Sequence, residues 1–213
     1  NSYWVHTEFN FSGDVQDFKV NTTPAEKTII KRTMLAIAQI EVQVKTFWSD
    51  IYEEMPKAEV GNVGMTFAES EVRHMDAYSH LLDILGIEDD FEQVTEVPAI
   101  KNRIEYLDRC LETNEENDKQ EYVKNILLFS TFVEHVSLFS QFLIMTSFDK
   151  HEKKFKGIAN AVEATSKEEQ IHGLFGVELV ETIKEENPEM FDDELEADVQ
   201  EACQQAYEAE MDI

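Results

Sequence analysis

The 213-residue sequence has little cysteine, glycine, proline or positive charge. It contains 2 Cys, 7 Gly and 4 Pro, and 18 Lys plus Arg against 45 Asp plus Glu, for a formal net charge of -27. Cys110 and Cys203 lie far apart and form no Cys-x-x-Cys pair, which excludes a disulfide scaffold and a cysteine zinc site and indicates a reducing, cytoplasmic setting. Because phosphate backbones and membrane surfaces repel so acidic a chain, we expect no nucleic-acid or membrane partner, and cations are better candidates.

The two ends and the longest apolar stretch show whether to expect a signal peptide, a truncated chain or a membrane span. No basic region followed by an apolar run stands at the N-terminus, so we expect no signal peptide in these residues. The length of the chain predicts a single domain, residues 1–213. Because the chain begins without Met and ends inside a helical pattern, we expect this domain to be truncated at both ends. Residues 125–148 are long enough for a membrane span, but Glu134, His135 and Gln141 interrupt them, which favours a buried core helix.

Abundant Glu, Leu, Ala and Lys, with no sustained alternation of apolar and polar residues, predict an all-α fold. A capping box at Thr23 to Glu26 opens the first long helix, and Gly86 is a plausible left-handed cap for the second. Helices of this length in one domain indicate a long-helix bundle. The acidic segments 88–90 and 115–118 are expected to be solvated connections. The helices are predicted over residues 24–51, 56–86, 99–112, 119–148, 151–185 and from 188 onward.

Four of these helices carry ionisable residues in the stripe that should face the core. Each stripe is traced by alternate steps of three and four residues. The stripes read Ile30, Met34, Ile37, Glu41, Val44, Trp48, Ile51; then Gly64, Phe67, Glu71, His74, Tyr78, Leu81, Leu85; then Leu127, Thr131, Glu134, Leu138, Gln141, Met145; and last Ile158, Val162, Thr165, Glu169, His172, Gly176, Leu179, Ile183.

Buried carboxylates are costly unless they are neutralised, ion-paired or bound to a metal. Lys31, Lys45 and Arg73 fall on other faces of these helices, which leaves cations as partners. Two Glu-x-x-His pairs and two lone Glu, one per helix, match the ligand set of carboxylate-bridged dimetal sites. Oxygen and imidazole ligands suit iron or manganese, and four carboxylates offset the charge of two divalent ions. The competing interpretation is that the register is misjudged and these Glu residues lie on the surface of an acidic protein.

These residues resemble the radical-generating small subunit of class I ribonucleotide reductase over nearly the whole chain. The resemblance rests on Trp4, Glu41, the segment 70–78, the segment 133–135 and the segment 168–172. It implies a ferritin-like helical core that holds two metals bridged by Glu71 and Glu169. In that arrangement Glu41 and His74 serve one ion, and Glu134 and His172 serve the other.

The same resemblance implies three residues for radical chemistry. Tyr78, one turn after His74, stands where the family keeps its radical-forming tyrosine. Trp4 stands where a tryptophan in a short N-terminal segment relays the oxidising equivalent between the metal site and the partner subunit. Glu168 occupies the position of the acid that completes the relay, where the family more often has Asp; its longer side chain could accept a hydrogen bond from His74, or it could be an exposed helix residue.

The resemblance therefore implies an enzyme, the small subunit of ribonucleoside-diphosphate reductase. It would generate and store a one-electron oxidant and pass it to a large catalytic subunit that reduces ribonucleotides to deoxyribonucleotides, and it would form a homodimer. The first ligand is Glu41 where Asp is common, which favours two Mn slightly over two Fe or a mixed Mn/Fe pair; with manganese, the metals could hold the oxidant and Tyr78 could stay reduced. A ferritin-like dimetal oxidase or monooxygenase and a ferritin-type metal storage protein remain alternatives.

Overall fold

A computed structural model describes residues 3–111 and 119–213. These residues are mostly helical and contain no strand, which confirms the predicted all-α fold. The predicted acidic connection at 115–118, and residue 112 of the third predicted helix, lie outside the described residues. The α-helices are α1 Ser12–Gln16, α2 Pro24–Glu54, α3 Ala58–Leu85, α4 Phe91–Val94, α5 Pro98–Leu111, α6 Lys119–Leu128, α7 Phe139–Ser147, α8 Lys156–Glu186 and α9 Asp193–Met211. The shorter 3-10 or π elements are η1 His6–Glu8, η2 Asp17–Asn21, η3 Glu88–Asp90, η4 Phe129–Ser137, η5 Phe148–Glu152 and η6 Pro188–Met190.

The described chain divides into two compact units. Unit 1 contains residues 3–95 and 139–168, and unit 2 contains residues 96–111, 119–138 and 169–213. Helix α8 supplies residues to both, because it belongs to unit 1 up to Glu168 and to unit 2 from Glu169. That residues 1–213 form a single domain stays a prediction.

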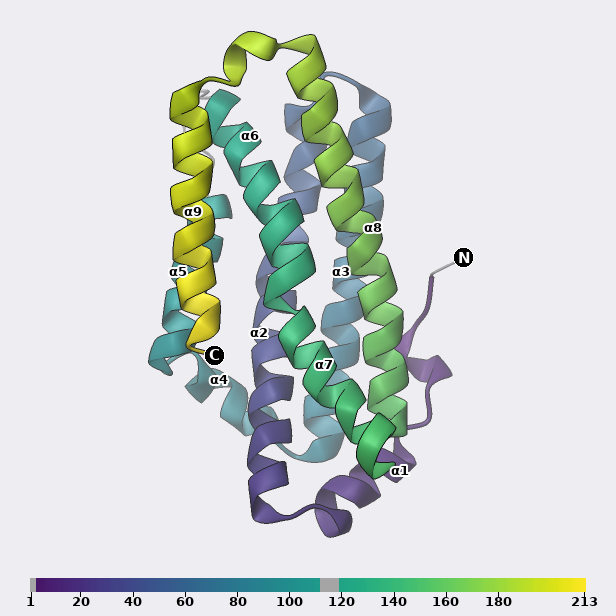
Figure 1. Cartoon of the computed structure of the whole chain (residues 1–213). Helices are drawn as coiled ribbons and strands as arrows, with labels where there is room; N and C mark the ends of the chain where they lie inside the picture. The colour runs from purple at the N-terminus through teal and green to yellow at the C-terminus, as the bar shows by residue number, and fades with distance from the viewer. Residues whose placement is uncertain (1–2, 112–118) are drawn as a thin grey trace. The chain divides into compact units, whose positions relative to one another are not determined.

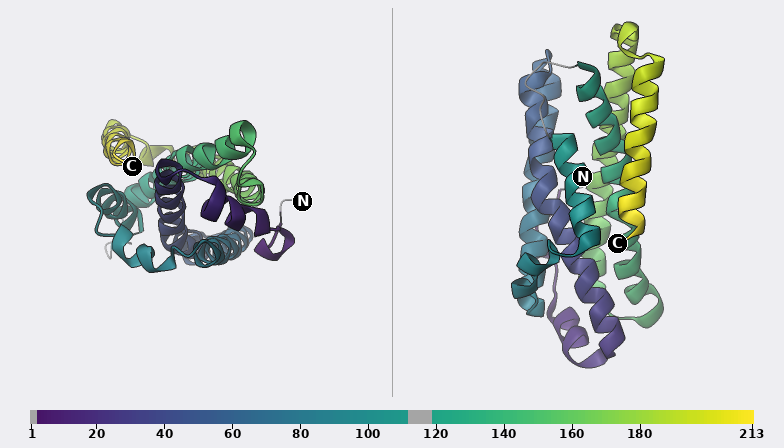
Figure 2. Two further views of the ribbon diagram at one scale, coloured as in Figure 1. Left: turned by 90° about the horizontal axis from the view of Figure 1, so that it is seen from below. Right: turned by 90° about the vertical axis from the view of Figure 1, so that its left-hand side faces the viewer.

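Unit 1 is built on the pair of long helices α2 and α3, which lie side by side (Figures 1 and 2). Thr23 and Glu26 form the predicted capping box at the start of α2. Gly86, with φ 71°, forms the predicted left-handed cap of α3. A Cβ on Gly64 would lie 2.4 Å from the carbonyl oxygen of Trp48, so this glycine lets the two helix backbones approach closely. Every residue of the predicted core stripes of α2 and α3 is buried.

The N-terminus of α8 is capped by side chains from the start of the chain. Buried Asp14 accepts hydrogen bonds from the backbone N–H groups of Gly157 (3.2 Å) and Ile158 (2.7 Å). Asp17 accepts another from the N–H of Phe155, at 3.0 Å. These carboxylates satisfy amides that the first turn of a helix leaves without an intrahelical partner. The predicted start of this helix at residue 151 is wrong, because Lys153 (φ 57°) and Phe155 (φ 60°) are left-handed and separate α8 from η5.

Unit 2 contains α5, α6, η4 and α9. Helix α9 packs against α5 and α6 (Figure 1). Arg103, fully buried on α5, donates to Glu210 of α9 at 2.9 Å and to the backbone carbonyl of Ser137 at 3.2 Å. The hydroxyl of Tyr106 donates to the same Glu210 and lies 2.6 Å from Ser137 Oγ. Burial, followed by the negative charge of Glu210, raises the pKa of Tyr106 well above its usual value, so this phenol stays protonated.

The apolar stretch 119–152 is helical apart from a turn at Leu138, with π-helical segments η4 between α6 and α7 and η5 after α7. It is the one candidate membrane span among the described residues by length and composition, but 61% of its most apolar window is buried within the protein, as expected for the predicted core helix. The predicted stripe is partly wrong here: Leu127 and Thr131 are only half-buried, whereas Phe129 and Val133 are buried. A π-helix has a longer repeat than the 3.6 residues assumed, which shifts the buried face.

Candidate metal centre

Unit 1 brings together three of the predicted metal ligands. Glu41 of α2 and Glu71 and His74 of α3 are fully buried, and each offers a ligand atom within 4.8 Å of the others. The Nδ1 atom of His74 lies 3.3 Å from Glu71 Oε2 and 3.6 Å from Glu41 Oε2. The three-residue spacing of Glu71 and His74 puts both side chains on one face of α3, and α2 supplies the facing carboxylate. The nitrogen that faces these carboxylates is therefore His74 Nδ1.

The other ring nitrogen of His74 faces Glu168. Its Nε2 lies 2.8 Å from Glu168 Oε2, and Glu168 is 5% exposed, so the possibility that Glu168 is a surface residue is excluded. Burial acts to raise the pKa of Glu168, but hydrogen bonds from His74 and Arg73 outweigh it and hold the pKa below its ordinary value. An ionised Glu168 accepts the Nε2 proton and leaves the lone pair of Nδ1 directed at Glu41 and Glu71. This is how carboxylates orient metal-binding histidines in proteins.

Trp4 lies against the same histidine. Its ring stacks on His74 with centroids 5.5 Å apart and an interplanar angle of 16°, and it packs edge-on against Phe9. Glu168 does not bond the indole: Trp4 Nε1 is buried and has no hydrogen-bond partner among the described residues. Instead, the backbone carbonyl of Trp4 accepts a 2.7 Å hydrogen bond from Arg73 Nη1.

Tyr78 is buried one turn beyond His74 on α3. Its hydroxyl lies 3.1 Å from Thr165 Oγ1, and Thr165 in turn donates to the carbonyl of Ala161 at 3.1 Å. A hydroxyl has one proton, and that of Thr165 is directed at Ala161, so Tyr78 donates to Thr165. The phenol proton therefore has a defined acceptor atom.

Unit 2 brings together the other three predicted ligands. Glu134 of η4 and Glu169 and His172 of α8 are buried, and their ligand atoms lie within 4.8 Å of one another. His172 Nδ1 lies 3.1 Å from Glu169 Oε2 and 3.9 Å from Glu134 Oε2. The group repeats the pattern of unit 1, with a Glu-x-x-His pair on one helix and a lone glutamate on another.

The chemistry of both groups fits a metal ion. Each consists of two carboxylates, which offset the charge of one divalent ion, and one imidazole whose Nδ1 faces them. Mixed oxygen and imidazole ligands suit iron and manganese, whereas a closed zinc site more often contains thiolates. The described residues therefore contain buried groups able to hold two ions.

Two residues in contact with this site were missed by the sequence reasoning. Arg73 lies off the core stripe of α3 and is not predicted as a site residue, yet it bonds both Trp4 and Glu168. Thr165 lies on the core stripe of α8, and the stripe alone predicts no role for its hydroxyl. A polar residue on a predicted core stripe is a signal that could have identified Thr165; nothing local marks Arg73, whose partner Glu168 is 95 residues away.

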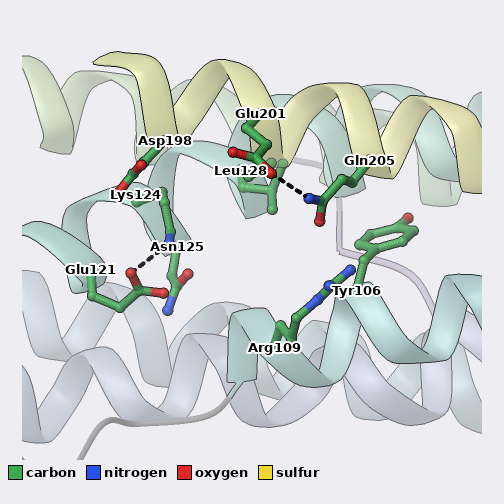
Figure 3. A pocket seen from close by; sticks show the side chains of 10 residues that line it. Tyr106, Arg109, Glu121, Lys124, Asn125, Leu128, Asp198, Glu201 and Gln205 are labelled. Atoms are coloured by element: carbon green, nitrogen blue, oxygen red, sulfur yellow. Dashed lines mark hydrogen bonds and ion pairs between the residues drawn. The ribbon is translucent and has the colours of Figure 1, made fainter. Parts of the chain in front are cut away.

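A cavity of about 390 Å³ lies in unit 2. Residues of α5, α6 and α9 line it (Figure 3). Two pairs of its polar groups interact along one helix, Lys124 with Glu121 and Gln205 with Glu201. None of the predicted ligands, Tyr78, Trp4 or Glu168 lines it. The cavity is therefore more consistent with a solvated groove than with a reactive site.

Solved structures share this fold, and three of them illustrate the likeness. The R2 subunit of ribonucleotide reductase from Clostridium botulinum has a TM-score of 0.86 at 17% identity, over 100% of this chain and 68% of that one. The dimanganese(II) NrdF of Streptococcus sanguinis has a TM-score of 0.82 at 17% identity, over 98% of this chain and 72% of that one. An R2-like ligand-binding oxidase variant with a Mn/Fe cofactor has a TM-score of 0.81 at 19% identity, over 98% of this chain and 75% of that one. These likenesses confirm the predicted ferritin-like fold.

The sequence comparisons identify the family. A relative from Invertebrate iridescent virus 3, named a probable ribonucleoside-diphosphate reductase small subunit, is 26% identical over 200 residues, which are 87% of this chain and 53% of that protein. The chain spans between 53% and 64% of the length of the curated relatives that it matches. The family model described as ribonucleotide reductase, small chain, matches residues 1–213. Because that match covers the whole chain, the chain belongs to the ribonucleotide reductase small chain family.

Proposed function

We propose that the protein containing this chain is the radical-generating small subunit of a ribonucleoside-diphosphate reductase. It generates a one-electron oxidant and passes it to a large catalytic subunit, where ribonucleotides are reduced to deoxyribonucleotides. Membership of the family supports this activity. We further propose that the protein is cytoplasmic, which agrees with its acidic, cysteine-poor composition and with the burial of its most apolar helix. We also propose that it forms a homodimer, which family membership supports.

The observation that carries the proposal is the arrangement around His74 in unit 1. The imidazole presents Nδ1 to two buried carboxylates, while Trp4 stacks on its face and Tyr78 follows one turn later. A metal-storage protein needs no oxidisable side chains at such short range, and an oxidase of a small substrate needs no tryptophan on the far side of its ligand. Redox-active aromatic residues beside a metal ligand are what the export of an oxidant requires.

The metal centre that we propose is dinuclear. Glu41, Glu71 and His74 would hold one ion, Glu134, Glu169 and His172 the other, and Glu71 and Glu169 would bridge them. The proposal draws on the family pattern and on the balance of four carboxylates against two divalent ions. When bound, a pair of Mn or Fe ions would supply a one-electron oxidant. We favour two Mn slightly over Fe or a Mn/Fe pair, and solved structures of the fold contain both a dimanganese and a Mn/Fe cofactor.

The chain's own residues have distinct parts in this function. Glu168 fixes the tautomer of His74 by accepting its Nε2 proton, so that Nδ1 is free of a proton. Tyr78 can lose one electron together with its hydroxyl proton, and Thr165 Oγ1 is the atom that this proton faces. Trp4 can give up an electron towards His74 through the stacked rings. Whether the stored oxidant is Tyr78 or the metals is decided by spectroscopy.

The test is the metal content of protein purified from metal-replete cells, together with its EPR spectrum. We expect about two Mn or Fe per chain, in line with two ligand groups, and loss of metal in Glu71→Ala and Glu169→Ala. A tyrosyl signal that disappears in Tyr78→Phe would assign the oxidant to Tyr78, whereas a multiline metal signal that persists would assign it to the metals. Absence of bound transition metal, or a large hollow oligomer that accumulates many ions per chain, would contradict the proposal.

A further inference from the structure

Arg73 makes contacts that neither the metal site nor the fold of α3 requires. It follows Val72 on α3 and precedes His74, and its side chain is largely buried, with 11% exposed. Nη2 lies 2.9 Å from Glu168 Oε1, and Nη1 lies 3.3 Å from Glu168 Oε2. This is the bidentate geometry by which a guanidinium holds a carboxylate in a fixed orientation.

The same guanidinium also holds the N-terminal segment, by which we mean residues 3–21, ahead of α2. Nη1 donates to the backbone carbonyl of Trp4 at 2.7 Å, and the guanidinium carbon lies 4.3 Å from the ring centroid of Tyr3. Its Nε is directed outward at Glu69, whose side chain is 54% exposed. Since an exposed ion pair contributes little, the contacts with Trp4, Tyr3 and Glu168 are those that matter for the site.

Glu168 connects Arg73 to His74. One of its oxygens, Oε2, takes the Nε2 proton of His74, while Oε1 takes the shorter of the two Arg73 bonds. The carboxylate therefore needs both partners for its orientation. A glutamate side chain has three rotatable bonds to fix, and Arg73 supplies the second anchor that holds this flexible chain in one orientation.

Trp4 has no comparable anchor of its own. Its indole Nε1 has no hydrogen-bond partner among the described residues, so the ring is placed by its stack on His74 and its contact with Phe9. The hydrogen bond that ties this residue to α3 is the one from Arg73 to its carbonyl. Arg73 therefore contacts Trp4 through its backbone and not through its ring.

We propose that Arg73 is a positioning residue that docks the N-terminal segment on α3, holding the Trp4 ring against His74 and aiming Glu168 at the same imidazole. Trp4 then couples to His74 through the stacked rings and not through a hydrogen bond from its indole to Glu168. This inference rests on the proposed function only where it assumes that Trp4 relays an oxidising equivalent. The docking itself is a property of the metal-free chain.

The test uses the fluorescence of Trp4 in metal-free protein treated with a chelator. The sequence contains two tryptophans, and subtracting the spectrum of a Trp4→Phe counterpart isolates the contribution of Trp4 in each background. In Arg73→Ala we expect the emission of Trp4 to shift to longer wavelength and to gain intensity. We also expect it to become as accessible to acrylamide as a solvent-exposed indole. In the unchanged chain it should stay blue-shifted, quenched by the stacked imidazole and protected.

Matched variants separate positioning from general loss of structure. Glu69→Ala removes the exposed ion pair between Arg73 and Glu69, and Arg32→Ala removes an exposed arginine of α2. Both variants should leave the fluorescence of Trp4 unchanged. Arg73→Lys keeps the positive charge but cannot form the two-pronged contact, so Trp4 should remain partly exposed. Far-UV circular dichroism should be the same for all variants.

An unchanged Trp4 signal in Arg73→Ala would overturn the proposal. If Trp4 were fully protected from acrylamide in Arg73→Lys, the two-pronged contact of the guanidinium would not be what docks the segment. Exposure of Trp4 in Glu69→Ala or Arg32→Ala would also overturn it, by showing that the segment undocks without specific loss of Arg73. Because no metal is present in the experiment, failure of the proposed function would appear in metal content and EPR, and would leave this result unaffected.

Discussion

At the residue scale, Glu26 shows how one carboxylate can secure two segments of the chain. It accepts hydrogen bonds from the backbone N–H of Thr23 (2.6 Å) and from Lys154 Nζ (2.9 Å). The bond from Thr23, followed by that from Lys154, lowers the pKa of Glu26 from 4.5 to about 2. A carboxyl group whose folded pKa is depressed contributes stability above its unfolded pKa and loses that contribution as the pH falls through its folded pKa.

We therefore expect Glu26→Gln to lower the melting temperature at pH 7. The difference from the unchanged chain should persist down to about pH 4.5 and shrink from there towards pH 2, because the ionised form is what the folded state favours. Thermal unfolding monitored by circular dichroism between pH 7 and pH 3 checks this, with Glu59→Gln as the exposed control. A difference that stays constant over that range would show that Glu26 acts by something other than its charge.

At the scale of elements, the close packing of α2 on α3 depends on Gly64. An alanine in a helix interior normally stabilises relative to glycine by up to about 1 kcal/mol. Here the added Cβ would lie 2.4 Å from the carbonyl oxygen of Trp48 and 3.1 Å from Ile51 Cβ. A backbone carbonyl cannot move without shifting its helix, so the clash outweighs the gain in propensity.

Gly64→Ala should therefore destabilise the protein by about 1–3 kcal/mol, the usual cost of overpacking. Gly13→Ala is the matched control, because nothing lies within 4 Å of its added Cβ, and it should be neutral or stabilising. Urea unfolding of both variants measures the difference. If the two variants had the same free energy of unfolding, α2 and α3 would be able to move apart and accommodate the added Cβ without loss of stability.

The elements also show what could be inferred from sequence. The core stripes of α2 and α3 were predicted residue by residue, because regular helices repeat every 3.6 residues and because Thr23 and Gly86 mark their ends locally. The same rule gave a partly wrong stripe around η4, where the π-helical repeat differs.

Contacts between residues distant in sequence could not be predicted. Asp14 and Ile158 are separated by 144 residues, and Arg73 and Glu168 by 95. Periodicity places a residue on a face of its helix, but it does not say which segment will cover that face. The candidate ligands were recognisable because a carboxylate on a core stripe is anomalous by itself; Arg73, on a partly exposed face, is not anomalous until its partners are known.

At the scale of the whole molecule, the formal charge of -27 makes cation binding a matter of stability as well as chemistry. Any divalent cation screens this charge, but a specific site stabilises further, by about 2.7 kcal/mol at a free ion concentration of 100 times its Kd. Mn²⁺ accepts imidazole and carboxylate together, whereas Mg²⁺ prefers oxygen ligands and retains its waters.

We expect the melting temperature to rise more with Mn²⁺ than with Mg²⁺ at equal concentration and ionic strength. The excess should vanish in Glu71→Ala and Glu169→Ala, while the smaller effect of Mg²⁺ remains. Calorimetry of the chelator-treated protein with each ion in turn measures both effects. If the two ions raised the melting temperature equally, the stabilisation would come from screening of the acidic surface and not from a specific site.

The capping of α8 by the start of the chain links two regions through the exchange of backbone protons. The amides of Gly157 and Ile158 are protected by Asp14, which follows Trp4 by ten residues in the same N-terminal segment. When that segment lifts away, those amide protons become open to solvent deuterium. The exchange rate at the first turn of α8 is therefore a readout of how often the segment that contains Trp4 leaves its place.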